Sequence, residues 1–281
     1  MFVEKTDSTN TLMREMLAKG EWPKNEGFLR AGFQTAGRGQ TGNKWESDEG
    51  QNILCSFLLP PIDDEPFYYT VAVSVAVYQV LEDVLSNEVR AFAESTDLPG
   101  IAKLMDLCRS KVPDLMIKWP NDIYYKDQKI AGILIEGGLT GSKMDYAIAG
   151  IGLNVNQTRW HSAPNAISIK TAARLISGYQ GDFDIEALME ALDEKIQQVF
   201  KMSPRVVWDR YMDVLYRSKG GPWPFVERTV DMAPTMNAPK GTKGTFRAWI
   251  IEVRPNGELV LQDDKNGEQR FYHFKQIRYV V

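Results

Sequence analysis

Two apolar segments in the middle of the chain constrain its fold more than any other feature. Ile130–Glu136 has the sequence IAGILIE, which is apolar on both faces of a strand, and Tyr146–Val155 is similar. A strand with two apolar faces has to be covered on both sides, so we expect both segments to be central strands of a sheet. Helices are then expected to flank this sheet.

Several shorter apolar runs are expected to extend the sheet. A hairpin is predicted where Ile123–Tyr125 meets the central strand, with residues 126–129 as its turn and Lys129 at its tip. The remaining predicted strands of this region are Phe28–Gln34, Asn52–Leu59 and Leu115–Trp119.

Helices are predicted from amphipathic spacing and capping residues. The clearest is Asp184–Phe200, whose apolar residues share one stripe. Phe67–Leu85 is ambiguous because its valines alternate as in a strand, but its length and a helical set of apolar residues favour a helix. The other predicted helices run from the capping residues Asp7–Asn10 to about Gly20, from about Pro204 to Tyr216, and, as a short helix, over Ile101–Cys108.

The chain changes character after Gly220-Gly221-Pro222. Two Asn-Gly pairs, Asn256-Gly257 and Asn266-Gly267, separate β-rich runs, and this dipeptide favours a type I′ turn, in which both central residues have positive φ. We therefore predict a β-meander that packs as a small barrel, with strands over Thr245–Arg254, Leu259–Gln262 and Gln269–Phe274. The expected fold class is α+β, with a first domain over residues 1–219 and a second over residues 220–281.

Composition argues against several functional classes. A net charge of −4 gives no sign of a chain whose main partner is nucleic acid. The longest apolar-rich stretch, near Tyr68–Val84, is interrupted by polar and charged residues and is too polar to span a bilayer. Only two cysteines, Cys55 and Cys108, and no visible secretory signal fit a reducing compartment. We therefore expect a cytoplasmic protein without a nucleic-acid or membrane partner.

Four segments carry residues suited to an anionic or polar ligand. The loop Gln34–Trp45 has three glycines that allow close backbone approach, and Arg38 supplies a cation for a phosphate or carboxylate. Lys118–Asp122 places a lysine beside a carboxylate, which suits a phosphate or metal site. Lys129 precedes a buried strand, and asparagines follow another within Gly150–Asn156. Each segment alone also has a structural interpretation: a surface loop, a solvated ion pair at a turn, a turn lysine and a capped strand.

Together and in this order, the four segments resemble the biotin protein ligases. The matching motifs are TDSTN at 6–10, Gln34 with GRG at 37–39 and Trp45, KWPND at 118–122, Lys129 with AGIL at 131–134, and GIGLN at 150–154. The resemblance is strong over residues 2–156. From Gly220 onward, position and hairpin pattern are similar to the family's C-terminal barrel, but the motif is weak.

The resemblance implies a class II synthetase-like catalytic domain, a mixed sheet with flanking helices, followed by a small SH3-like β-barrel. It implies an ATP-dependent ligase that forms biotinyl-5′-AMP and transfers biotin to a lysine of a biotin carboxyl carrier domain. The expected ligands are biotin, ATP and Mg²⁺, with no tightly bound prosthetic group, and homodimers occur in the family. Because the STN motif starts at Ser8, we expect a short form that lacks an N-terminal DNA-binding domain and has no repressor activity.

The resemblance also assigns site residues. The expected catalytic residues are Lys129, which would bridge the biotin carboxylate and the α-phosphate, and Arg38. The expected biotin-binding residues are Ser8, Thr9, Asn10, Gln34, Gly37, Arg38 and Gly132. The expected nucleotide-binding residues are Gly39, Trp45, Lys118, Asn121 and Asn154, with Asp122 as a ligand of Mg²⁺. Hydroxyl and amide groups suit the ureido ring of biotin, because a urea has both donors and an acceptor.

Two features depart from the family pattern. Gln40 stands where many members have an arginine that helps to retain the adenylate, so tight retention is in question. The stretch Asn87–Pro113 is longer than the usual connection, and a tolerated surface insertion is favoured over a partner surface.

Two alternative functions stay open. A lipoate–protein ligase is disfavoured because the sequence has no RRxSGGG-type segment. A non-catalytic biotin or adenylate sensor is disfavoured because Lys129 and Arg38 are both present.

Overall fold

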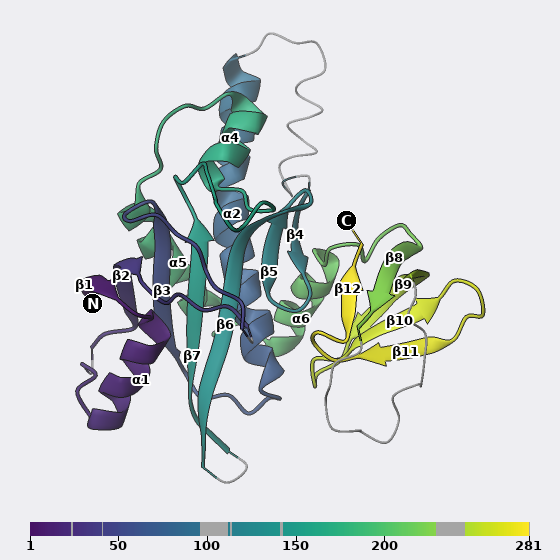
Figure 1. The fold of residues 1–281 in the computed structure, drawn as a ribbon, viewed down its shortest axis with the longest axis horizontal. Helices are drawn as coiled ribbons and strands as arrows, with labels where there is room; N and C mark the ends of the chain where they lie inside the picture. The colour runs from purple at the N-terminus through teal and green to yellow at the C-terminus, as the bar shows by residue number, and fades with distance from the viewer. Residues whose placement is uncertain are drawn as a thin grey trace.

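Two β-sheets organise the computed structural model of the chain (Figure 1). The structure describes residues 1–23, 25–40, 42–95, 112, 114–140, 143–228 and 245–280. The larger sheet has the strand order β1-β2-β3-β7-β6-β5-β4, and the smaller one has the order β11-β10-β9-β8-β12. Helices lie against the larger sheet and the smaller sheet lies beside it, so the expected α+β class is confirmed.

The two apolar segments lie in the interior of the larger sheet, as predicted. β6 (Gln128–Thr140) contains Ile130–Glu136, and β7 (Lys143–Asn154) contains nearly all of the second segment. β7 pairs with β3 and β6, and β6 pairs with β5 and β7, so neither is an edge strand. Neighbouring residues that point to opposite faces of β6, such as Ile130 and Ala131, are both fully buried.

The other strands of the larger sheet follow the predicted segments with small shifts at their ends. They are β2 (Phe28–Gln34), β3 (Asn52–Leu59), β4 (Leu115–Lys118) and β5 (Asp122–Tyr125). β1 (Phe2–Thr6) has no predicted counterpart, because its sequence FVEKT is too short and polar to stand out; it pairs in parallel with β2.

The β5–β6 hairpin corrects the predicted place of Lys129. Tyr125 pairs with Gln128, so the two residues between them form the turn. Lys129 pairs with Tyr124 and therefore lies within β6 rather than at the tip of the hairpin. The Lys129 N–H donates to the Asn165 carbonyl at 2.8 Å, and the Lys129 carbonyl accepts from the Ile167 N–H at 2.9 Å, which fixes the direction of the Lys129 side chain better than a turn would.

Five helices in the described residues accompany the larger sheet. They are α1 (Thr9–Lys19), α2 (Phe67–Ser95), α4 (Ile169–Ser177), α5 (Ile185–Val199) and α6 (Pro204–Asp213). Gly20 ends α1 in the left-handed conformation, as the sequence predicts, and Asp184 caps α5 through its side chain. α4 has no predicted counterpart.

The ambiguous valine-rich segment is a helix, as favoured, but it extends beyond the predicted end at Leu85 to Ser95. The first part of the long connection Asn87–Pro113 is therefore a continuation of α2. The short helix predicted over Ile101–Cys108 lies outside the described residues.

The helices divide between the two faces of the larger sheet. α2 contacts α4, α5 and α6 and packs on β4, β5, β6 and β7, where the main hydrophobic core lies. α1 contacts β2, β3 and β7 and forms a separate small core of Met13, Leu29 and Ile148. The α1 face is therefore only partly covered, which leaves room for a pocket beside α1.

The smaller sheet contains the predicted meander. Its strands are β8 (Trp223–Glu227), β9 (Thr245–Val253), β10 (Leu259–Asp263), β11 (Gln269–Tyr272) and β12 (Ile277–Tyr279). All its pairings are antiparallel, and β8 and β12, which were not among the predicted strands, complete a five-stranded unit consistent with a small barrel. The division at residue 219 stays a prediction.

The predicted type I′ turns are wrong in detail. Gly257 and Gly267 have positive φ, at 86° and 70°, whereas Asn256 and Asn266 do not. The Gly257 N–H donates to the Arg254 carbonyl, as in a turn that places its single left-handed residue last. Only the glycine thus needs the left-handed region, which is the arrangement of longer hairpin loops.

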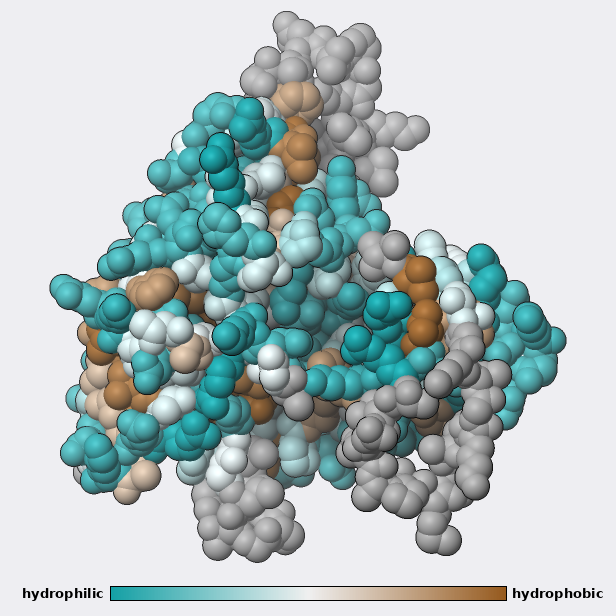
Figure 2. Space-filling view, viewed as in Figure 1, coloured by the Kyte–Doolittle hydropathy of each residue, from teal (hydrophilic) through white to brown (hydrophobic). Residues whose placement is uncertain are grey.

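The surface on the viewed side is largely hydrophilic (Figure 2). Apolar atoms gather over α1 and β1 and in a short column on the smaller sheet. Within the described parts of the chain, none of the helices is both long and apolar enough to span a membrane.

Candidate active site

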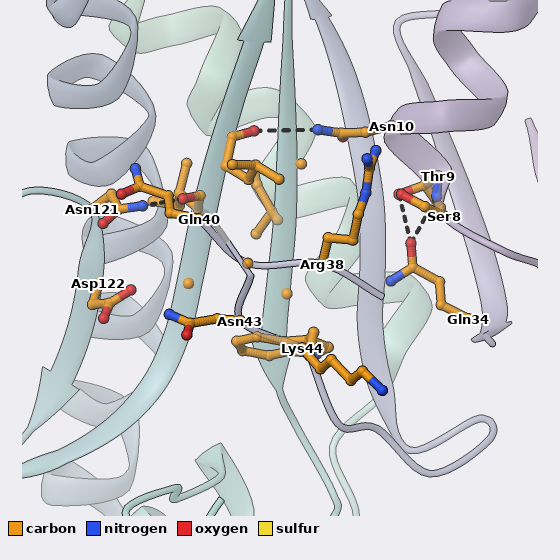
Figure 3. Close-up of a pocket in the computed structure, with 18 of the residues that line it drawn as sticks. Ser8, Thr9, Asn10, Gln34, Arg38, Gln40, Asn43, Lys44, Asn121 and Asp122 are labelled. Atoms are coloured by element: carbon orange, nitrogen blue, oxygen red, sulfur yellow. Dashed lines mark hydrogen bonds between the residues drawn. The ribbon is translucent and has the colours of Figure 1, made fainter. Parts of the chain in front are cut away.

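A pocket lies on the α1 face of the larger sheet, where the loop after β2 crosses β6 and β7 (Figure 3). It holds about 710 Å³ of empty space, part of it open to solvent. Of the predicted site residues, Gly37, Lys118 and Asn154 do not line it. The predicted residues that do are Ser8, Thr9, Asn10, Gln34, Arg38, Gly39, Trp45, Asn121, Asp122, Lys129 and Gly132.

The polar end of the pocket is built at the start of α1. Ser8 is the N-cap residue, but its hydroxyl makes no capping hydrogen bond. Gln34 at the end of β2 caps the helix instead, because Gln34 Oε1 accepts from Thr9 N at 2.7 Å and lies 3.2 Å from Thr9 Oγ1 (Figure 3). The Ser8 hydroxyl is therefore not needed as a cap and lines the pocket.

Asn10 is held on every side by other polar groups. Its Nδ2 donates to Glu136 Oε2 at 2.8 Å and to the Leu134 carbonyl at 3.4 Å. Its Oδ1 accepts from Ser56 Oγ at 2.5 Å. The Asn10 side chain also fills the place of a missing side chain, since a Cβ on Gly150 would lie 2.5 Å from Asn10 Oδ1. Asn10 is therefore part of a fixed wall.

The floor of the pocket is made of glycines. Gly132 of β6 and Gly152 of β7 are register partners, and the Trp45 ring lies against both. A Cβ on Gly152 would lie 2.4 Å from Trp45 Cε2, and a Cβ on Gly132 would lie 3.0 Å from Trp45 Cζ3. Trp45 Nε1 is buried without a hydrogen-bond partner among the described residues. The glycine pair thus accommodates a flat ring and leaves one indole donor unused.

Lys129 and Asp122 form an ion pair at the other end of the pocket. The distance from Lys129 Nζ to Asp122 Oδ1 is 2.6 Å, and both side chains are about one-third exposed or less. Lys129 Nζ also lies 5.5 Å from the centre of the Trp45 ring. No cluster of three or more metal-ligating side chains exists in the described part of the chain.

Lys118 lies beside this pair but outside the pocket lining. Its Nζ donates to Tyr124 Oη at 2.9 Å and lies over the rings of Tyr124 and Tyr279. Burial lowers the pKa of Lys118, the charges of Lys129 and Arg217 act in the same direction, and Asp122 opposes them. Lys118 and Asp122 are register partners, so their side chains share one face of the sheet.

Arg38 on the glycine loop is turned toward α1. Its Nη2 donates to Thr11 Oγ1 at 2.8 Å and lies 3.6 Å from Glu136 Oε2. Gln40 on the same loop also lines the pocket, and its Oε1 is buried without a partner among the described residues.

The two predicted asparagines of the nucleotide site have different positions. Asn121 lines the pocket, and its Nδ2 donates to the Ile133 carbonyl. Asn154 lies behind the wall, almost fully buried, and its Nδ2 donates to the Ile167 carbonyl at 3.0 Å and the Lys129 carbonyl at 3.4 Å. Asn154 therefore supports the strand that carries Lys129.

Several residues of the site are absent from the sequence prediction. Ser56 and Glu136 hold Asn10, and Phe274 reaches the pocket from the segment between β11 and β12. Ser56 is a polar residue within the apolar run NILCSFLL, and Glu136 ends an apolar strand, so both carry a weak signal. Phe274 carries none, because its place depends on how the two sheets pack.

The chain belongs to the biotin/lipoate A/B protein ligase family, whose family model matches residues 2–154. One curated relative is the bifunctional ligase/repressor BirA of Escherichia coli K12. It is 30% identical over 152 residues, which cover 53% of this chain and 38% of that protein. Another is the biotin–[acetyl-CoA-carboxylase] ligase of Paracoccus denitrificans, which is 27% identical over 180 residues that cover 63% of this chain and 61% of that protein. The chain therefore spans less than two thirds of the length of these relatives.

Solved structures share the fold over the whole chain. The biotin protein ligase from Aquifex aeolicus in complex with biotin and ATP has a TM-score of 0.65 at 20% identity, covering 100% of this chain and 98% of that one. The biotin protein ligase from Leishmania major in complex with biotin has a TM-score of 0.57 at 21% identity, covering 97% of each chain. The chain thus shares its fold, including the C-terminal sheet, with these solved structures.

Proposed function

We propose that this chain is a biotin protein ligase, which activates biotin with ATP and transfers it to a lysine of a biotin carboxyl carrier domain. The observation that carries the proposal is that one pocket has two chemically different ends on either side of a glycine floor. Hydroxyl and amide groups of Ser8, Thr9 and Gln34 line one end, and Lys129 with Asp122 lies at the other.

The polar end suits a ureido ring. A cyclic urea presents N–H donors and a carbonyl acceptor, and hydroxyl and amide side chains can serve both. The Trp45 ring, which lies on the glycine pair and lines the pocket, offers a flat apolar surface that suits the flat part of a ligand. The biotin–[acetyl-CoA-carboxylase] ligase of Paracoccus denitrificans and the Aquifex aeolicus structure with biotin and ATP support the same assignment.

The cationic end suits the joining of two anions. In the first step a carboxylate oxygen of biotin attacks the α-phosphorus of ATP, the bond to the bridging oxygen breaks and pyrophosphate leaves. Lys129 would stabilise the charge that develops between carboxylate and α-phosphate. In the second step the carrier amine attacks the acyl carbon of the adenylate, loses a proton and releases AMP.

Arg38 and Lys129 must both change partners for this reaction. Lys129 would exchange Asp122 for the ligand, and Arg38 would leave Thr11 and Glu136 to reach the biotin carboxylate or the phosphate. Lys118, which shares the face of Asp122, would add positive charge for the phosphates. Asn121 would lie beside the adenine.

Mg²⁺ is proposed as the counter-ion of ATP. Asp122 offers one carboxylate, which fits an ion held chiefly by substrate phosphates and water, as Mg²⁺ usually is. When bound, the ion would neutralise phosphate charge. We place the enzyme in the cytoplasm, which the presence of only two cysteines in the sequence supports, and a homodimer stays a prediction.

Pyrophosphate release with ATP and Mg²⁺ tests the proposal. We expect release that depends on biotin and not on lipoate, followed by labelling when a biotin carboxyl carrier domain is added. Dependence on lipoate would instead assign the pocket to the other branch of the family. Tight biotin binding without turnover would make the chain a sensor.

A further inference from the structure

A fully buried serine stands behind the polar end of the pocket. Ser56 lies on β3 with no exposed surface, and its Oγ is 2.7 Å from Thr9 Oγ1 and 2.5 Å from Asn10 Oδ1. It does not line the pocket. Its two partners do, and both are proposed to surround biotin.

Counting protons fixes the direction of each hydrogen bond. An amide oxygen can only accept, so the contact with Asn10 Oδ1 uses the one proton of Ser56. The contact between Ser56 and Thr9 then has to use the proton of Thr9. Gln34 Oε1 is served by the Thr9 N–H at 2.7 Å, so it does not depend on that hydroxyl proton.

The hydrogen bond between Ser56 and Asn10 cannot be reversed by rotating the Asn10 amide group. Its Nδ2 faces two oxygens, Glu136 Oε2 and the Leu134 carbonyl, and a rotated amide would bring its own oxygen against both. The orientation of Asn10 is therefore set from the other side, and Ser56 has to be the donor.

The result is a defined pattern at the pocket edge. Thr9 Oγ1 gives its proton away from the pocket and keeps its lone pairs as acceptors. Gln34 keeps Nε2, a donor that has no hydrogen-bond partner elsewhere in the described chain, because its Oε1 is the atom bound to Thr9. One acceptor beside one donor matches the N–H and the carbonyl of a cyclic urea.

We propose that Ser56 is a positioning residue that sets this donor–acceptor pattern for the ureido ring of biotin, an inference that rests on the proposed function. Without its hydroxyl, Asn10 Oδ1 becomes a buried acceptor without a donor, and the Thr9 proton is free to point into the pocket. A buried polar group without a hydrogen-bond partner costs free energy, so the polar end of the pocket would be less well fixed. Ser56 thereby governs biotin affinity without touching biotin.

The test compares steady-state pyrophosphate release by the wild type, Ser56→Ala and Ser74→Ala. Ser74 is a matched control, because it is also fully buried but its hydroxyl has no partner among the described residues. For Ser56→Ala we expect the KM for biotin to rise about 10- to 100-fold, while kcat and the KM for ATP change by less than about 3-fold. Ser74→Ala should leave all three within about 3-fold.

The outcomes separate the inference from the proposed function. An unchanged KM for biotin in Ser56→Ala, or equal losses in kcat and both KM values, overturns the role of Ser56 while the ligase assignment stands. No biotin-dependent release by the wild type overturns both. If Ser56→Ala does not fold, Ser56→Cys keeps the volume with a much weaker donor and should shift the biotin KM in the same direction.

Discussion

At the residue scale, the site depends on side chains whose partners set their chemistry. Lys118 shows this best, because its ammonium is buried among tyrosine rings and lies near a second lysine. Burial lowers its pKa, so the neutral form is favoured at a lower pH than for an ordinary lysine. If this charge attracts the phosphates of ATP, the loss of its proton has a measurable effect on the rate.

The predicted effect is an early alkaline decline. We expect kcat/KM for ATP to fall with a midpoint below about 10.4, the ordinary lysine value, because this parameter reports the free enzyme. Lys118→Arg should move the decline to higher pH, since arginine keeps its charge. An unchanged profile in that variant would remove Lys118 from the phosphate site.

The same pKa shift has a definite sign for stability. Between the lowered pKa of the folded state and the ordinary value, the unfolded chain binds the Lys118 proton more readily than the folded chain does. The contribution of this residue to stability therefore rises with pH in that interval.

At the element scale, the glycine loop and the two central strands act as one unit. Trp45 lies on Gly132 and Gly152, and Glu46 next to it accepts hydrogen bonds from the backbone of His161 and Ser162. The loop is therefore anchored at its end by a segment far away in the sequence. The position of the Trp45 ring depends on the absence of side chains at Gly132 of β6 and Gly152 of β7.

Gly152→Ala tests this dependence. The new Cβ would lie 2.4 Å from the Trp45 ring, which is too close, so the ring has to leave the pocket floor. We expect kcat/KM for ATP and for biotin to fall about tenfold or more. A tenfold fall corresponds to a loss of about 1.4 kcal/mol in transition-state stabilisation. Gly27→Ala is the control, because its nearest atom would be 3.7 Å away and the activity should not change. Equal activity of both variants would contradict a role for the floor.

Sequence reasoning predicted this region well where local pattern decides the structure. The central strands, α1, α5 and α6 follow from periodicity and capping residues, and most of the predicted site residues meet in one pocket. Periodicity could not reveal β1, whose place depends on pairing with β2, or the partners of Asn10. The β1–β2 pairs lie 28 residues apart, and the partners of Asn10 lie 46 and 126 residues away, so all these contacts depend on tertiary packing.

At the scale of the whole molecule, the two sheets are joined through the same turn that bears Asn121 and Asp122. Trp119 Nε1 donates to the Gly257 carbonyl at 3.1 Å, and its ring lies 6.3 Å from that of Phe274. Buried residues form one cluster that continues from the larger sheet into the smaller one. The C-terminal sheet is thus part of the structure that positions the pocket.

Trp119→Phe should therefore weaken the molecule as a whole. It keeps an aromatic ring but removes the donor to a buried carbonyl, so we expect the free energy of unfolding to fall by about 1–3 kcal/mol. The wild type should unfold in one transition by calorimetry. Trp22→Phe, which loses only a local bond to the Glu26 carbonyl, is the matched control and should cost less. Two well-separated transitions in the wild type would show that the sheets fold independently.

The most direct test of the central claim is mass spectrometry of a biotin carboxyl carrier domain incubated with ATP, Mg²⁺, biotin and this protein. We expect one biotinyl group to be added to a lysine of the carrier by the wild type and by Lys126→Ala, which changes an exposed lysine in the turn of the same hairpin. We expect no addition by Lys129→Ala, together with loss of adenylate formation and an unchanged unfolding temperature. Full labelling by Lys129→Ala would contradict the catalytic assignment, and no labelling by the wild type would contradict the function.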